Sequence, residues 1–127
     1  MQMIMLYYVD SLEQLMRAIM ELEGVPFSST DDPDDAIRMM EASASPCVLF
    51  TDNYKANRTI RATLTRVRAN SALRGKVWIV GMDTQNPLTE VFLRAGLIDE
   101  WLSLPFPVEK IENLLDRARA SARASAP

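Results

Sequence analysis

The chain opens with an almost wholly apolar run, from Met3 to Val9, which ends at Asp10 and Ser11. A continuous apolar run of this length is typical of a strand buried on both faces, as strands of parallel sheets are. From Leu12 to Leu22 the apolar residues recur three and four positions apart, which predicts an amphipathic helix. We expect Ser11 to cap the start of this helix and Gly24 to follow its end.

Strand and helix patterns go on alternating after this first pair. Val25 to Ser29 predicts a weak strand, which Pro26 places at a sheet edge. Asp32 before Pro33 is typical of a helix start, which we favour over a charged active-site loop. That helix is expected over Asp34–Ala42, the later strands over Cys47–Thr51, Lys76–Val80 and Glu100–Ser103, and the later helices over Lys55–Asn70, Asn86–Ala95 and Pro107 to about Ala120.

This alternation predicts one α/β domain, a doubly wound parallel sheet with helices on both faces. A chain of 127 residues is long enough for one core and too short for two domains. We expect the domain to cover residues 1–120. The tail over 121–127 is rich in Ala, Arg and Ser and is expected to be a linker, to which an output domain would attach.

The composition excludes several classes of function. With 17 acidic and 14 basic residues the net charge is -3, which argues against direct nucleic-acid binding. The chain has no histidine and a single cysteine, Cys47, which lies in an apolar run and is expected to be a buried thiol. Zinc, haem and histidine-based catalytic sets are therefore excluded. No apolar stretch suits a membrane span and no signal peptide is evident, so we expect a cytoplasmic protein.

Candidate chemistry lies where the strands end, since ligands of such sheets bind at the carboxyl ends of the strands. Asp10 follows the first predicted strand and Asp52 the third. If these carboxylates are adjacent they form a hard oxygen site suited to Mg²⁺. The alternative is that both aspartates simply end strands and accept hydrogen bonds from loop amides. The glycine-rich phosphate loops of nucleotide-binding proteins are absent.

Three segments, Tyr8–Ser11, Val48–Asp52 and Leu104–Phe106, together resemble the receiver domain of bacterial two-component response regulators. The resemblance extends from about Met3 to Ala120. It implies a flavodoxin-like fold with a five-stranded sheet in the order 2-1-3-4-5, five helices and a histidine kinase as partner.

The resemblance also implies roles for individual residues. Asp52 would be the phosphoacceptor. Mg²⁺ would be held by Asp10, Asp52 and the backbone carbonyl of Tyr54. A receiver domain is not itself an enzyme, so we expect signalling rather than catalysis.

Three positions depart from the family pattern. Ser11 stands where a second acid is usual, Gly81 where a switch Ser or Thr is usual, and Leu104 where a lysine is usual. Losing a carboxylate weakens Mg²⁺ binding, and losing the lysine removes a charge-assisted bond typically worth about 1.5–3 kcal/mol. We therefore interpret the chain as an atypical receiver with impaired or absent phosphorylation that acts mainly through protein contacts. The alternative is a phospho-accepting switch that uses Asp10 and Asp52 alone.

The resemblance points to the fourth helix, fifth strand and fifth helix as the contact surface, for a homodimer or another signalling protein. Trp101 corresponds to the switch aromatic of the family and is a candidate interface anchor, with core packing an equally open alternative. Trp78, in the middle of a strand, is expected in the core.

Overall fold

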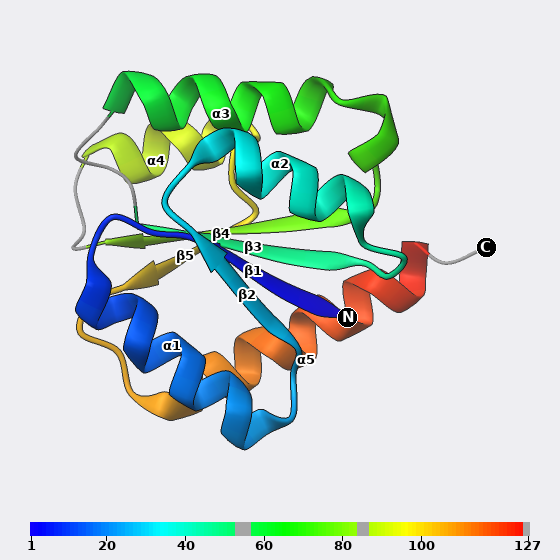
Figure 1. Ribbon diagram of the computed structural model, residues 1–127. Coiled ribbons are helices and arrows are strands. Elements are labelled where there is room, and N and C mark those ends of the chain that lie inside the picture. The colour runs from blue at the N-terminus through cyan, green and yellow to red at the C-terminus, as the bar shows by residue number, and fades with distance from the viewer. Residues whose placement is uncertain (53–56, 84–86, 126–127) are drawn as a thin grey trace.

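The computed structural model describes the backbone of residues 1–52, 57–83 and 87–125, and the side chains of residues 1–52, 60–82 and 90–120. Within these residues the chain forms five strands, five α-helices and one short 3₁₀ helix (Figure 1). The strands are β1 (Gln2–Leu6), β2 (Phe27–Thr30), β3 (Cys47–Thr51), β4 (Val77–Asp83) and β5 (Glu100–Ser103). The helices are α1 (Asp10–Glu23), α2 (Pro33–Ala42), α3 (Asn57–Ala69), η2 (Ser71–Leu73), α4 (Pro87–Arg94) and α5 (Val108–Ser125).

The strands form one parallel sheet in the order β2-β1-β3-β4-β5. Helices α2, α3 and α4 cover one face and α1 and α5 cover the other (Figure 1). The register pairs Leu6 with Thr51 and Thr51 with Gly81, so β1, β3 and β4 run in step toward the same edge. The predicted doubly wound sheet and its order 2-1-3-4-5 are confirmed.

Alternating side chains of the central strands supply two buried clusters, one on each face of the sheet. In β3, Leu49 faces α2, α3 and α4, whereas Phe50 faces α1 and α5. Both faces are buried, which explains the continuous apolar strand patterns. Cys47 is buried as expected, and Trp78 packs at the margin of the cluster beneath α1 and α5.

The start of α1 differs from the prediction. β1 ends at Leu6 rather than Val9, and α1 begins at Asp10. The N-cap residue is Val9. Among the described residues, no side chain caps the start of α1 with a hydrogen bond. The prediction that Ser11 caps this helix is wrong. Tyr8 and Val9 do not extend the strand, because their backbone amides donate to the Asp52 side chain and not to a neighbouring strand. The helix therefore begins from Val9, one residue before Asp10.

Strand β4 is longer than predicted. It continues beyond Val80 to Asp83 because β5 pairs alongside it, with Gly81 opposite Trp101 and Asp83 opposite Ser103. Gly81 therefore lies within the strand and does not follow it.

The remaining boundaries mostly agree with the sequence patterns. At the start of α2, Asp32 Oδ1 accepts a hydrogen bond from the Asp34 amide at 3.1 Å, which confirms the capping interpretation. β2 is an edge strand, as Pro26 indicated. α5 extends to Ser125, past the expected end near Ala120. The predicted starts of α3 at Lys55 and of α4 at Asn86 lie outside the described residues.

Candidate functional site

Asp52 directly follows β3 at the carboxyl edge of the sheet, and its side chain is buried at 7% exposure. Its Oδ1 accepts a hydrogen bond from the Tyr8 amide at 2.6 Å, and its Oδ2 accepts one from the Val9 amide at 3.1 Å. Both donors belong to the loop between β1 and α1. Asp52 therefore bonds loop amides, and its role as phosphoacceptor and metal ligand stays a prediction.

Asp10 is the residue after Val9 and the first residue of α1. Its side chain is exposed, and a carboxylate in the first turn of a helix is favoured by the helix dipole. Because Val9 is bonded to Asp52, the backbone of Asp10 lies one residue from that contact. The fold thus brings both predicted acids to the same edge, with Asp52 buried and Asp10 in solvent.

The three departing positions carry no charge, and of the three only Ser11 has a hydroxyl. Ser11 is exposed in the first turn of α1, and Gly81 is buried inside β4. Leu104 is half-buried just after β5 and is joined to Pro105 by a cis peptide bond. Tyr54, whose carbonyl was predicted as a metal ligand, lies outside the described residues.

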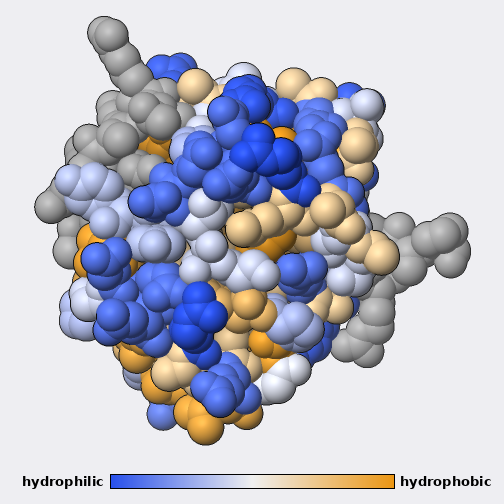
Figure 2. Space-filling model, viewed as in Figure 1, coloured by the Kyte–Doolittle hydropathy of each residue, from blue (hydrophilic) through white to orange (hydrophobic). Residues whose placement is uncertain are grey.

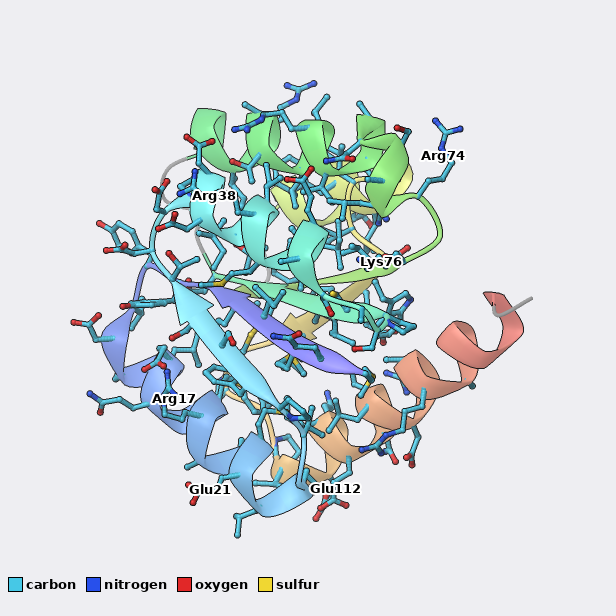
Figure 3. All side chains as sticks on the ribbon, turned by 45° about the vertical axis from the view of Figure 1, so that its right-hand side comes forward. Arg17, Glu21, Arg38, Arg74, Lys76 and Glu112 are labelled. Carbon is cyan, nitrogen blue, oxygen red and sulfur yellow. The ribbon has the colours of Figure 1, made fainter. Side chains whose placement is uncertain are left out.

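Of the lysine side chains in the described part of the chain, neither replaces the one missing at position 104. Lys76 lies at the amino end of β4, the opposite end of the sheet from Asp52, and donates to the Ser43 carbonyl (Figure 3). Lys110, in the first turn of α5, lines a groove with Glu100 and other residues.

The donor set for a metal ion is sparse. Within residues 1–52, 60–82 and 90–120, no three or more acidic or cysteine side chains are grouped so as to hold a metal ion. Among the side chains that the structure describes, Asp10 and Asp52 thus offer at most a pair of carboxylates at this edge. Mg²⁺ is often bound through only one or two carboxylates and several waters, so this donor set fits a weak Mg²⁺ site.

The same edge carries a local negative field. Tyr7 follows β1 and is partly buried against the cluster beneath α1. Its phenol pKa is raised above the usual value of 10.0, first by desolvation and then by the negative charges of Asp31, Asp10 and Glu13. The positive charge of Arg17 opposes this effect.

A groove of about 280 Å³ lies between β5 and α5. Arg117 lines it and pairs with Glu100 at 2.6 Å, an ion pair that joins the two elements. Trp101 also lines the groove, yet it packs against the buried cluster beneath α2, α3 and α4 as well. The two interpretations of Trp101, surface anchor and core residue, are thus compatible.

No protein-family model and no curated protein matches the sequence. Several solved structures do match it. The chemotaxis response regulator CheY4 of Vibrio cholerae superposes with a TM-score of 0.73 and 19% identity, over 93% of this chain and 98% of that one. A CheY-like receiver domain protein from Methanospirillum hungatei gives 0.64 and 18%, over 98% and 96%.

The receiver domain of a sensor histidine kinase from Pseudomonas aeruginosa gives a TM-score of 0.71 and 17% identity, over 91% of this chain and 94% of that one. That structure has a magnesium ion coordinated in its active-site cleft. The chain therefore has the fold of response-regulator receiver domains, as the resemblance implied. In the described part of the chain, no helix is both long and apolar enough for a membrane crossing.

Proposed function

We propose that this protein is an atypical receiver domain in phosphorelay signalling, which acts through protein contacts and does not depend on phosphorylation of Asp52. One observation carries the proposal. Both carboxylate oxygens of Asp52 accept backbone hydrogen bonds in a buried position, and the positions that would assist phosphorylation hold Ser11 and Leu104.

The chemistry of phosphoryl transfer supports this conclusion. Such transfer is catalysed almost entirely by positioning and by neutralising charge, with little covalent work for the protein. Here the hydroxyl of Ser11 replaces a carboxylate and the aliphatic Leu104 replaces an ammonium group. The Asp52 carboxylate accepts hydrogen bonds from two backbone amides, and positions 11 and 104 offer it neither a second metal-binding carboxylate nor an ammonium group.

A phospho-accepting switch is the second candidate, favoured by the exposed position of Asp10 beside the loop that Asp52 bonds. In that case Asp10 and Asp52 would hold Mg²⁺, together with the carbonyl of Tyr54. The ion would supply the neutralising charge that the side chains lack, and its binding would be weak because Ser11 offers no carboxylate.

The contact surface we propose is formed by α4, β5 and α5. The groove there combines an aromatic residue, Trp101, with the polar side chains of Lys110 and Asn113. Its partner is a second copy of the chain, a histidine kinase or another cytoplasmic signalling protein. The net charge of -3 argues against nucleic acid. We take residues 1–120 as the receiver domain and residues 121–127 as its tail.

Direct phosphorylation tests the proposal. The protein is incubated with Mg²⁺ and acetyl phosphate, and its intact mass is measured beside that of Asp52→Asn. We expect no stoichiometric phosphoryl adduct on either protein. An adduct on the unmodified protein that is absent from Asp52→Asn would overturn the proposal in favour of the phospho-accepting switch.

A further inference from the structure

We infer that Asp52 is a positioning residue that holds the loop between β1 and α1. A cation bound to its carboxylate, or a group attached to it, therefore loosens that loop. This goes beyond the proposed function, because it holds whether or not Asp52 accepts a phosphoryl group. The inference rests on how the backbone hydrogen bonds are distributed between residues 7 and 13.

Sheet pairing at this edge stops at Tyr7, whose amide donates to the Thr30 carbonyl at 3.0 Å. The next two amides, of Tyr8 and Val9, have left the sheet, and the Asp52 carboxylate accepts from both. A carboxylate with 7% exposure loses most of its hydration, and two N–H donors replace it. Hydrogen bonds to an ionised acceptor are also stronger than neutral ones.

These bonds fix the point from which α1 begins. The Val9 carbonyl accepts from the amides of Leu12 and Glu13, both at 3.2 Å, and so starts the helix. On its other side, Val9 is held through its amide by Asp52. Because the N-cap residue of α1 has an aliphatic side chain, which cannot cap, the contact from Asp52 just after β3 sets the position of the first turn.

The loop that Asp52 holds presents apolar surface. Tyr8 is 56% exposed and Val9 39% exposed, and Leu15 lies partly exposed one helical turn beyond the start of α1. Figure 2 shows hydrophobic residues scattered over α1, whereas hydrophilic ones dominate over α2 and α3. A change at the Asp52 carboxylate therefore alters how this hydrophobic surface is presented.

Electrostatics sets the direction of the response. A divalent cation draws the carboxylate charge toward itself, and a phosphoryl group on one oxygen removes that oxygen as a charged acceptor. Either change weakens the acceptor that the amides of Tyr8 and Val9 share. The expected result is a loosened loop and a less ordered first turn of α1.

Amide hydrogen exchange measured by NMR tests this inference. In the unmodified protein the amides of Tyr8 and Val9 are expected to be protected. In Asp52→Ala they should exchange at least about tenfold faster, since the two charge-assisted bonds are lost. The amide of Tyr7 serves as an internal reference, because it bonds Thr30 and should keep its rate.

Two further variants complete the experiment. Asp52→Asn keeps one oxygen acceptor and should deprotect one of the two amides more than the other, and it also serves if Asp52→Ala does not fold. Asp31→Asn is the matched control, because it makes the same change at an exposed loop acid and should leave both rates unchanged. Unchanged exchange of Tyr8 and Val9 in a folded Asp52 variant would overturn the inference, whatever the phosphorylation experiment shows.

Discussion

The Val9 amide lies 3.1 Å from Oδ2 of Asp52, so the N-cap residue of α1 is tied to the residue that directly follows β3. The start of this helix is therefore set by a contact between segments far apart in the sequence. A local side-chain cap, which the sequence suggested at Ser11, has no part in it.

The first prediction concerns the starts of α1 and α2. Ser11→Ala should leave the free energy of unfolding unchanged or raise it by up to about 0.5 kcal/mol, because Ala favours helix and no cap is lost. Asp32→Ala should lower it by about 1 kcal/mol, because the Asp32 side chain caps α2. Urea unfolding of both variants checks this. A larger loss for Ser11→Ala than for Asp32→Ala would contradict the assignment.

The second prediction concerns Arg68, which joins α3 to the segment before β5. Its guanidinium donates to the Gly96 carbonyl at 2.9 Å and to Asp99 Oδ2 at 2.8 Å, and Asp99 also accepts from the Ile79 amide at 2.7 Å. Arg68→Ala should therefore lower the free energy of unfolding by about 1–3 kcal/mol.

Arg66→Ala is the control for Arg68. Arg66 lies on the same helix, but its ion pair with Asp34 is exposed, at 56% and 59% for the two side chains. Its loss should cost no more than about 0.5 kcal/mol. Equal effects of the two substitutions in the same urea series would show that the Arg68 contacts contribute little.

The third prediction follows from the raised pKa of Tyr7. The native state keeps the phenol proton at pH values where the unfolded chain, with a tyrosine pKa near 10, has released it. This contribution to stability is fully present below about pH 10 and is lost as the pH rises through the native pKa. Tyr7→Phe should remove that part of the alkaline stability loss.

Absorbance of tyrosinate during alkaline titration measures the pKa directly. The difference between the unmodified protein and Tyr7→Phe isolates one phenol from those of Tyr8 and Tyr54. Asp31→Asn should shift this difference titration to lower pH, because the Asp31 charge contributes to the shift. A Tyr7 pKa at or below the ordinary value of 10.0 would contradict the burial and the neighbouring negative charges that raise it here.

The fourth prediction addresses the groove between β5 and α5. Asn113 lines the groove and Glu112, its neighbour on α5, is exposed outside it (Figure 3). If two copies associate through this surface, Asn113→Arg should weaken the dimer about tenfold or more, as the loss of a central contact does. Glu112→Arg should not. Sedimentation velocity compares the two, and equal behaviour of both variants in a self-associating protein would exclude this surface.

The sequence predicted the fold well because most elements are defined by local patterns. β3 reads as an uninterrupted apolar run from Cys47 to Thr51, and the Asp32–Pro33 pair marks the start of α2. The errors occur where pairing between distant segments decides the outcome. β4 continues past Gly81 because β5 lies beside it, and β1 stops early because the Tyr8 and Val9 amides bond Asp52.

The candidate site was predictable only in part. Patterns at strand ends placed Asp10 and Asp52 at one edge, since parallel strands end together. They did not reveal which carboxylate would be buried, because backbone donors carry no sequence signal. The hydrogen bonds from the Tyr8 and Val9 amides to Asp52 agree with the alternative that such an aspartate bonds loop amides, and they leave its chemical role a prediction.

The most direct test of the central claim is the binding of beryllofluoride, which mimics a phosphoryl group on aspartate, in the presence of Mg²⁺. Fluorine NMR is recorded for the unmodified protein and for a variant that combines Ser11→Asp with Leu104→Lys, with Ser11→Asp plus Ser103→Lys as the control. If Asp52 is held by the loop, and the missing carboxylate at position 11 and the missing ammonium at position 104 prevent phosphorylation, only the first variant gains a bound signal. Saturable binding to the unmodified protein, abolished by Asp52→Asn, would contradict the account.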